Sequence, residues 1–348
     1  MTNRPILAAT MGDPAGIGPE ICVRALLSPE VRDVSRSFVI GDARVLQRAL
    51  QVCGLDATLH HIEGPEALPG GLQDKPGVID VLHQDSANPA KLRMGEVQPL
   101  GGEAAFAAIR ASIDLAMSHR VAGVVTAPIN KESLKAAKIP FIGHTEMFAE
   151  YTGATEEMTM FTIVGLKIFF LTRHMSLAQA CASITVPRVT KGINQCIKAL
   201  HQLGYEEPHL AVAALNPHGG EDGMFGREEI EGIKPAIAEA RARGLKISGP
   251  VPADSVFHLA RIGRYDAVLS LYHDQGHIAA KMMDFEKTVS VTLGLPVLRT
   301  SVDHGTAFDI AGTGKASAVS MIEAIRVAAE YAVRGVKLGD APVARAAE

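Results

Sequence analysis

The sequence contains few of the features that mark membrane-spanning or nucleic-acid-binding proteins. No apolar run reaches the roughly 18 residues that a membrane helix needs, and the first ten residues show no signal-peptide pattern. The 34 basic and 38 acidic residues give a net charge of -4, and no long block carries a single sign. We therefore expect neither a nucleic-acid partner nor a membrane partner.

Cysteine is also scarce, with four residues that form no closely spaced pair. Scattered thiols within apolar or helix-like stretches are typical of reduced core residues in a cytoplasmic protein. None has the polar surroundings that activate a thiol, so we expect no catalytic or metal-binding cysteine. The four are Cys22, Cys53, Cys181 and Cys196.

The chain has ample material for a folded core, because 47% of its 348 residues are hydrophobic. Short apolar runs alternate with helix-length amphipathic stretches, which predicts an α/β fold with a largely parallel sheet. Two neighbouring runs joined by Gly165-Leu166 predict an antiparallel hairpin. Strands are predicted at 6–9, 38–40, 121–126, 158–164, 167–172, 210–215 and 267–271, and helices at 19–27, 103–118, 187–203, 228–243 and 318–333.

Three histidines each follow a predicted strand: His174, His218 and His273. Because the carboxyl ends of parallel strands form the binding crevice of an open α/β sheet, these imidazoles are candidates to converge on one ion. Three nitrogens with an open position suit catalytic zinc or a similar divalent metal. Glycine and carboxylate neighbours are typical of a ligand loop with supporting residues. Histidines at strand ends also often bond only to backbone, so both interpretations stay open.

Two further groups of polar residues have the composition of a ligand site. The run 126–132 follows an apolar strand and is followed by Gly143-His144-Thr145-Glu146, whose donors suit an oxyanion; Asn130 or Thr145 would otherwise be helix caps. The small residues of 299–315 permit close approach of a phosphate.

Two nucleotide-binding motifs are excluded. The run ending at Lys315 is not a P-loop, because Ala316 replaces the required Ser or Thr and Asp309 replaces the first glycine. The run beginning at Gly16 is not a Rossmann fingerprint, because Ile21 replaces the third glycine. A nicotinamide cofactor would therefore be held in another way.

Six separated motifs, in order, resemble the 4-hydroxythreonine-4-phosphate dehydrogenase (PdxA) family of pyridoxine biosynthesis. They lie at 10–20, 126–132, 143–146, 215–218, 272–276 and from 292 to 314, and so span most of the chain. The resemblance implies an isocitrate/isopropylmalate-dehydrogenase-like fold, with two α/β lobes and an active-site cleft between them. It implies one lobe of 1–130 plus about 285–348, and a central lobe of about 131–284. It also implies a homodimer whose active site draws on both subunits.

The resemblance further implies a set of site residues. His174, His218 and His273 match the family's metal ligands, for one Zn, Mg, Mn or Co ion per site. His144 and Thr145 match its substrate-contacting pair, and Lys281 and Arg299 match basic residues that meet substrate carboxylate or phosphate. Asp254 falls in a family motif as a catalytic candidate with no firm role. The segment His304, Gly305, Thr306, Ala307 and Asp309 matches the loop that serves NAD or NADP.

One departure from the family pattern concerns the substrate. Ser290 lies where the biosynthetic enzymes commonly carry Asn, and the run 276–281 is atypical. A hydroxyl has less reach and one donor fewer than an amide, so 4-hydroxythreonine 4-phosphate need not be the substrate. Similar relatives imply D-threonate or D-erythronate 4-phosphate, with dihydroxyacetone phosphate and carbon dioxide as products, or a dihydrodiol carboxylate.

We therefore predict an NAD(P)-dependent, metal-dependent dehydrogenase that oxidises and decarboxylates a phosphorylated hydroxy acid. Two other classes stay open at this point: an enzyme resembling phosphate acyltransferases, which need no nicotinamide, and a non-enzymatic binding protein.

Overall fold

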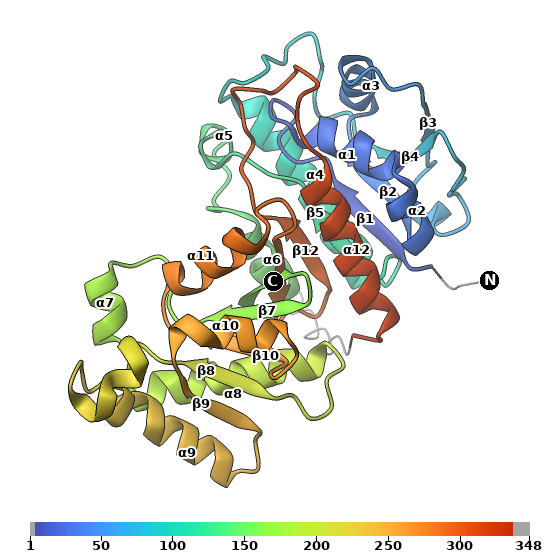
Figure 1. Cartoon of the computed structure of the whole chain (residues 1–348). Coiled ribbons are helices and arrows are strands. Elements are labelled where there is room, and N and C mark those ends of the chain that lie inside the picture. Colours follow the sequence, from blue (N-terminus) through green and yellow to red (C-terminus); the bar gives the residue numbers. More distant parts are fainter. Residues whose placement is uncertain (1–3, 337–348) are drawn as a thin grey trace, which may run out of the picture. The chain divides into compact units, whose positions relative to one another are not determined.

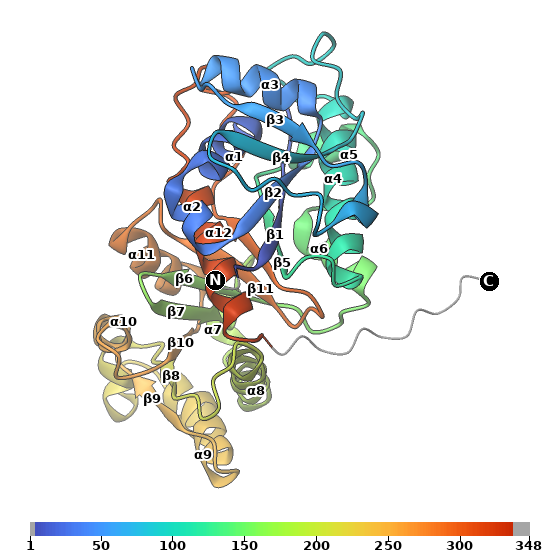
Figure 2. The same ribbon diagram turned by 90° about the vertical axis from the view of Figure 1, so that its right-hand side faces the viewer.

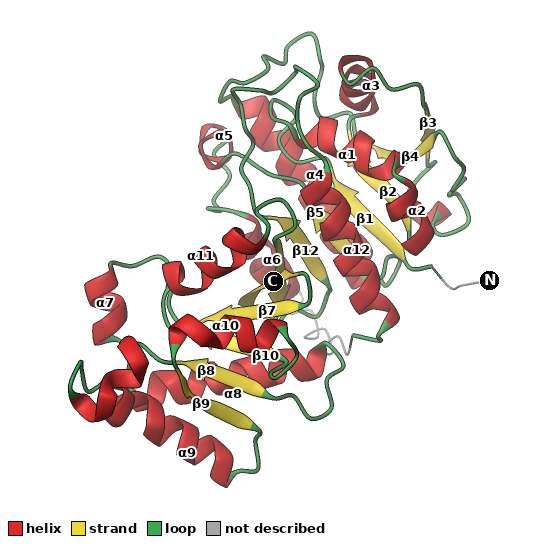
Figure 3. Cartoon of the chain, viewed as in Figure 1, coloured by secondary structure: helices red, strands yellow, loops and turns green. Residues whose placement is uncertain are grey.

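The computed structural model describes residues 4–336 and divides the chain into two compact units (Figure 1). Unit 1 contains the residues up to Glu157 and those from Leu295 onward, and unit 2 is Met158–Gly294. Helices and strands alternate in both units, which confirms the predicted α/β class (Figure 3). No described helix has both the length and the apolar composition needed to cross a bilayer. The lobe boundaries implied near residues 130 and 285 stay predictions.

The sheet of unit 1 is parallel throughout, with strand order β3-β4-β2-β1-β5-β12. Its central strands are short and almost wholly buried, as expected for strands covered on both faces. The strands are β1 (Ile6–Thr10), β2 (Arg36–Gly41), β3 (Thr58–His61), β4 (Val78–His83), β5 (Gly123–Thr126) and β12 (Arg299–Val302).

Helices cover both faces of this sheet (Figure 2). On one face α4 and α6 pack against β2 and β5 through a core that includes Phe38, Ile109 and Phe148. On the other, α12 contacts β12, β5 and α1. The helices are α1 (Gly18–Leu27), α2 (Pro29–Val34), α3 (Ala43–Val52), α4 (Pro99–Met117), α5 (Lys131–Ala136), α6 (His144–Thr152) and α12 (Val319–Val333), with a 3-10 turn at Pro65–Ala67.

The sheet of unit 2 is mixed, with strand order β11-β6-β7-β10-β8-β9. The predicted hairpin is confirmed, because β6 and β7 pair antiparallel; β7, β10, β8 and β9 then run parallel. The strands are β6 (Met158–Ile163), β7 (Leu166–Phe170), β8 (Leu210–Ala213), β9 (Ile247–Val251), β10 (Ala267–Ser270) and β11 (Val289–Leu293).

Two helices, α10 and α11, pack on one face of this sheet over a core that includes Phe161, Phe170 and Val268. Helix α8 packs on the other face, where Gly192 lies against Leu171. The helices are α7 (Leu177–Ala182), α8 (Val186–Gln202), α9 (Lys234–Ala242), α10 (Ala253–Arg261) and α11 (His273–Met283), with a 3-10 segment at Pro217–Gly223 and a π turn at Glu229–Ile233.

The predicted strands and helices are present, with three differences. Helix α4 begins at Pro99 rather than residue 103, because Gly101 and Gly102 allow close packing: a Cβ atom on Gly102 would lie 2.3 Å from the Ser133 carbonyl oxygen. The predicted helix 228–243 begins as a π turn. The ligand loop predicted from His273 onward is wrong, because His273 is the first residue of α11.

Candidate functional site

The three predicted metal ligands follow three neighbouring parallel strands of unit 2. His174 follows β7, His273 follows β10 and His218 follows β8, and β10 pairs with both of the others. The side chain of Gln275 connects two of these strand exits, since it accepts from Leu271 N at 2.7 Å and donates to Ala214 O at 2.8 Å. The sequence therefore correctly placed all three histidines after parallel strands that share one edge of the sheet.

One ring nitrogen of His273 is bonded to a carboxylate. Its Nδ1–H donates to Asp274 Oδ1 at 2.7 Å, which leaves Nε2 as the acceptor nitrogen. The ring centre of His174 lies 6.3 Å from that of His273. Two rings that share one ion through nitrogens at about 2.1 Å have centres at most roughly 6.4 Å apart, so this separation is at the outer limit.

His218 lies in an unusual backbone segment. All five residues from His218 to Asp222 have positive φ, and His218 Nδ1–H donates to Glu221 Oε1 at 3.2 Å. The segment is held by the fully buried Glu229, whose Oε1 accepts from Leu215 N at 2.8 Å and Asn216 N at 2.7 Å. This role of Glu229 could not be predicted from the sequence, because its partners Leu215 and Asn216 lie outside its own helix.

The donor set fits a divalent metal in its chemistry. Histidine ligands usually donate their second ring nitrogen to a carboxylate, and both His273 and His218 do so. Within residues 4–336, however, no three His, Cys, Asp or Glu side chains are grouped closely enough to hold an ion. The structure brings His174 and His273 near each other and places His218 with Glu221.

One face of α11 carries further polar groups. His277 and Lys281 follow His273 at intervals of four residues, and the Lys281 ammonium lies 5.0 Å from the Phe285 ring centre. The ring of His277 stacks on that of His273, with centres 3.6 Å apart. The sequence analysis missed His277, and its spacing of four from His273 was the available signal.

Two other predicted residues of unit 2 lie on its sheet and on a neighbouring helix. Ser290 lies on β11, directly across from Phe161 of β6. Asp254 is exposed at the start of α10, where it lines a pocket of about 530 Å³ together with Tyr272 and Asp274.

In unit 1, His144 shares a buried environment with Arg299. His144 and Thr145 begin α6, and Arg299 begins β12 and donates from Nη2 to Thr126 Oγ1 at 2.9 Å. The Arg299 guanidinium lies 5.4 Å from the Phe148 ring centre. These contacts fix a cation beside an imidazole, an arrangement suited to an anionic ligand.

Burial changes the acidity of both groups. The pKa of Arg299 falls to about 10 because its guanidinium is desolvated, and the Glu146 carboxylate partly opposes this. The pKa of His144 lies well below its usual value, first because the ring is buried and second because Arg299 is positively charged. His144 Nε2 is buried and has no hydrogen-bond partner among the described residues. A neutral imidazole with one uncommitted nitrogen is therefore available to a ligand.

Of the two residues considered as helix caps, Asn130 and Thr145, only Asn130 is one. Asn130 caps α5, because its Oδ1 accepts from Ser133 N at 2.9 Å. Thr145 is not a cap, since it is the second residue of α6 and Gly143 precedes the helix.

The predicted cofactor loop is fixed by the first helix of the chain. Thr306 is buried and its carbonyl accepts from Ile17 N at 3.0 Å, while Gly16 lies so close that a Cβ atom would be 2.8 Å from Thr306. The buried Glu20 carboxylate accepts from Gly312 N at 2.6 Å and Gly314 N at 2.9 Å. The segment 16–20 at the start of α1 and the predicted cofactor loop are thus in contact.

Within this loop the residues differ in exposure and backbone. Gly305 and Asp309 are exposed, and His304 is half-buried with Nδ1–H donating to Gly305 O at 3.0 Å. Ala307 adopts φ +42, which is rare for a residue with a side chain. The exposed Asp309 carboxylate is a suitable acceptor for the ribose hydroxyl groups of a nicotinamide cofactor.

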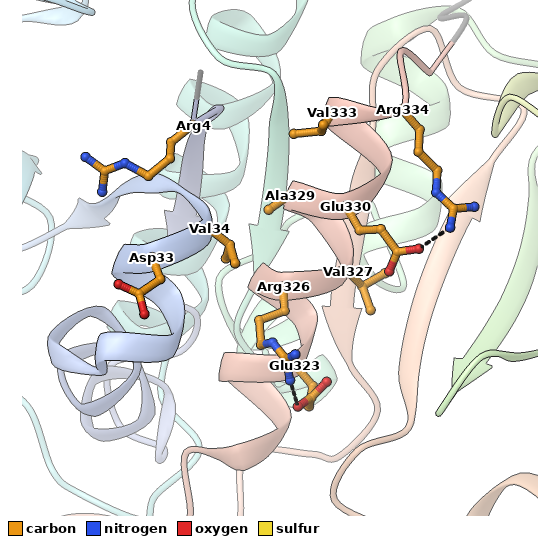
Figure 4. Close-up of a pocket in the computed structure, with 10 residues that line it drawn as sticks. All are labelled: Arg4, Asp33, Val34, Glu323, Arg326, Val327, Ala329, Glu330, Val333 and Arg334. Atoms are coloured by element: carbon orange, nitrogen blue, oxygen red, sulfur yellow. Dashed lines mark hydrogen bonds and ion pairs between the residues drawn. The ribbon is translucent and has the colours of Figure 1, made fainter. Parts of the chain in front are cut away.

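A pocket of about 670 Å³ in unit 1 contains none of the predicted site residues (Figure 4). Helices α2 and α12 line it, with Val34, Ala329 and Val333 among its apolar residues. Two ion pairs border it, each at 2.8 Å: Arg326 with Glu323 on α12, and Glu330 of α12 with Arg334, which directly follows the helix.

Two solved structures of dehydrogenases are similar to this chain over nearly all of its length. A solved structure of 4-hydroxythreonine-4-phosphate dehydrogenase from Klebsiella pneumoniae is 41% identical, with a TM-score of 0.86 over 95% of this chain and 98% of that chain. A terephthalate 1,2-cis-dihydrodiol dehydrogenase structure from Burkholderia xenovorans is 28% identical, with a TM-score of 0.63 over 94% of this chain and 98% of that chain.

Among curated proteins, one from Symbiobacterium thermophilum named "Putative D-threonate 4-phosphate dehydrogenase" is 57% identical over 332 residues, or 95% of this chain and 98% of the relative. The family model described as pyridoxal phosphate biosynthetic protein PdxA matches residues 33–328. A family match across most of the chain, with identity this high over nearly its full length, shows that the chain belongs to the PdxA family.

Proposed function

We propose that this chain is a divalent-metal-dependent dehydrogenase that uses NAD or NADP to oxidise and decarboxylate a 4-phosphorylated 3-hydroxy acid. The observation that carries the proposal is the position of three histidines after three neighbouring parallel strands, two of them with Nδ1 bonded to a carboxylate. Membership of a family whose relatives are named dehydrogenases supports an oxidoreductase acting on a CH–OH group, against the acyltransferase and binding-protein alternatives.

D-Threonate 4-phosphate is the substrate that we propose. The relative named for that substrate is 57% identical, compared with 41% for the enzyme named for 4-hydroxythreonine 4-phosphate and 28% for the dihydrodiol dehydrogenase. Ser290 agrees with this order, because its hydroxyl replaces an amide expected of the biosynthetic enzymes. 4-Hydroxythreonine 4-phosphate is the second candidate, favoured by the TM-score of 0.86.

Three histidines would hold the metal, with Nε2 of His273 and His218 as donors together with His174. The resemblance implies a dimer with shared sites, so we assign His218 to the ion held by His174 and His273 of a second subunit. Exposed apolar side chains on unit 2 support such a partner surface. They include Leu177, Met224, Ile278, Met282 and Phe285, each at least 60% exposed.

The remaining residues would bind and orient the two organic ligands. Arg299, His144 and Thr145 supply a buried cation and donors for a carboxylate or phosphate group. Lys281 binds substrate charge from α11. When bound, the ion supplies Lewis-acid chemistry and the nicotinamide accepts hydride. Oxidation of the 3-hydroxyl gives a β-keto acid, which then loses carbon dioxide.

The test is formation of reduced cofactor by purified protein with NAD or NADP and each of four acids. These are D-threonate 4-phosphate, D-erythronate 4-phosphate, 4-hydroxythreonine 4-phosphate and a dihydrodiol carboxylate. We expect the highest kcat/KM with D-threonate 4-phosphate, release of one carbon dioxide per reduced cofactor, and loss of both on chelation. Reduction that survives complete metal removal would overturn the metal assignment, and no reduction with any of the four would overturn the function.

A further inference from the structure

We infer that His277 is a positioning residue that holds the ring of His273 in place for metal binding. The inference rests on the proposed function, because it takes His273 to be a metal ligand. It concerns a residue that the sequence analysis did not select.

Two contacts join the side chain of His277 to His273. Their spacing of four residues on α11 puts both rings on one helix face, where they stack with centres 3.6 Å apart and planes inclined by 13°. In addition, His277 Nδ1–H donates to the carbonyl oxygen of His273 at 2.9 Å. One side chain therefore restrains both the backbone and the ring plane of His273.

The other side of His277 is anchored in the core of unit 2. Its ring centre lies 4.5 Å from that of Phe161 and 4.4 Å from that of Phe170. Both phenylalanines are nearly fully buried members of the core under α10 and α11. The ring of His277 is thus packed between the hydrophobic core and the more exposed ring of His273. Because core side chains are closely packed, the His277 ring has little room to move, and it therefore restrains the His273 ring.

His273 is then restrained in two directions. His277 covers a face of its ring, and Asp274 holds its Nδ1–H edge at 2.7 Å. With face and edge both fixed, Nε2 has a defined direction although the His273 side chain is 41% exposed. Supporting contacts of this kind raise metal affinity, because the ligand loses less rotational freedom when it binds.

The same geometry argues against His277 as a ligand of the same ion. A metal ion lies close to the plane of an imidazole that binds it. Because the two ring planes are nearly parallel and their centres are 3.6 Å apart, an ion in the plane of one ring lies outside the plane of the other. His277 therefore supports the ligand rather than joining it.

The test is titration of metal-free protein with Co²⁺, followed by visible absorption, which reports both affinity and ligand geometry. In His277→Leu, which keeps the contact with Phe161 and Phe170 but has no flat face, we expect about 10- to 100-fold weaker Co²⁺ binding and an altered spectrum. His277→Phe restores a flat ring and should recover most of the affinity.

A matched control is His201→Ala, since His201 also donates from Nδ1 to a carbonyl four residues away, that of Tyr205, at 2.8 Å. This variant should bind Co²⁺ as the wild type does. Wild-type affinity and spectrum in His277→Leu, with binding lost in His273→Ala, would overturn the positioning role alone. Unchanged Co²⁺ binding in His273→Ala would instead overturn the metal site of the proposed function, and the positioning role with it.

Discussion

The His144 imidazole lies next to the Arg299 guanidinium in a buried environment, where burial and the neighbouring positive charge together keep the pKa of His144 well below its usual 6.5. The folded protein therefore holds His144 neutral at pH values where the unfolded chain takes up a proton. Because the unfolded state then binds more protons, the stability that depends on neutral His144 is complete above pH 6.5 and is lost as the pH falls below it.

Replacement of the His144 ring should make the free energy of unfolding less dependent on pH in acid. In His144→Asn, the free energy of unfolding should fall less steeply as the pH drops below about 6.5. The difference in slope should correspond to at most roughly one proton taken up on unfolding. Urea unfolding at several pH values measures this slope. His119→Asn is the control, because His119 is exposed and has positive φ, which Asn tolerates. An unchanged slope in His144→Asn would contradict the assignment of a neutral buried ring.

Mixed dimers test whether two subunits share one metal site. His218→Ala and His273→Ala should each be inactive alone, since every site lacks a ligand. When the two variants are co-expressed, about half of the dimers should be mixed, and in each mixed dimer one of the two sites has all its ligands. The total activity should therefore recover to at most about a quarter of the wild-type value. No recovery in purified mixed dimers would indicate that all three histidines serve a site within one subunit.

The hydrogen bonds of Glu20 predict a selective effect on cofactor binding. Glu20→Gln keeps one acceptor but directs an amide N–H₂ toward the backbone N–H of Gly312 or Gly314, which should loosen the loop that carries His304 and Asp309. We expect a loss of about 1.5–3 kcal/mol in the free energy of unfolding and a higher KM for the nicotinamide, with little change in KM for the acid. Glu30→Gln, on the exposed start of α2, should change neither quantity.

Ser290 predicts a change of substrate preference. Ser290→Asn restores the amide of the biosynthetic pattern opposite Phe161, so kcat/KM should fall at least about tenfold for D-threonate 4-phosphate relative to 4-hydroxythreonine 4-phosphate. Ser290→Thr, which keeps the hydroxyl, is the matched control. An equal loss for both acids in Ser290→Asn would show a packing effect rather than substrate selection.

Most strands could be predicted because their apolar runs are buried on both faces, as in β1 and β10. Five strands were missed: β3, β4, β9, β11 and β12. In β3 and β4, His60 and Asp80, which pair at 2.7 Å, interrupt the apolar pattern. Helix α11 was missed because it begins His-Asp-Gln-Gly, which has little helix propensity; tertiary packing around Gly276 outweighs this.

The candidate site was predictable to the extent that its residues follow strands. His174, His218 and His273 were found in this way, and the resemblance supplied His144 and Arg299. The role of Glu20 was not predictable, because Glu20 and its partner Gly314 are 294 positions apart in the sequence. Contacts over such separations have no local periodicity from which to infer them.

The tight packing of Gly276 limits how this enzyme family member can change its substrate. A Cβ atom on Gly276 would lie 2.5 Å from the Phe170 ring and 2.7 Å from Ser270 Oγ, so α11 is in close contact with β7 at this position. The helix therefore cannot slide along the sheet to fit a longer or shorter acid. The positions of His273, His277 and Lys281 relative to the sheet stay the same. New specificity is more accessible through exchange of individual side chains, such as Ser290, on an unchanged backbone.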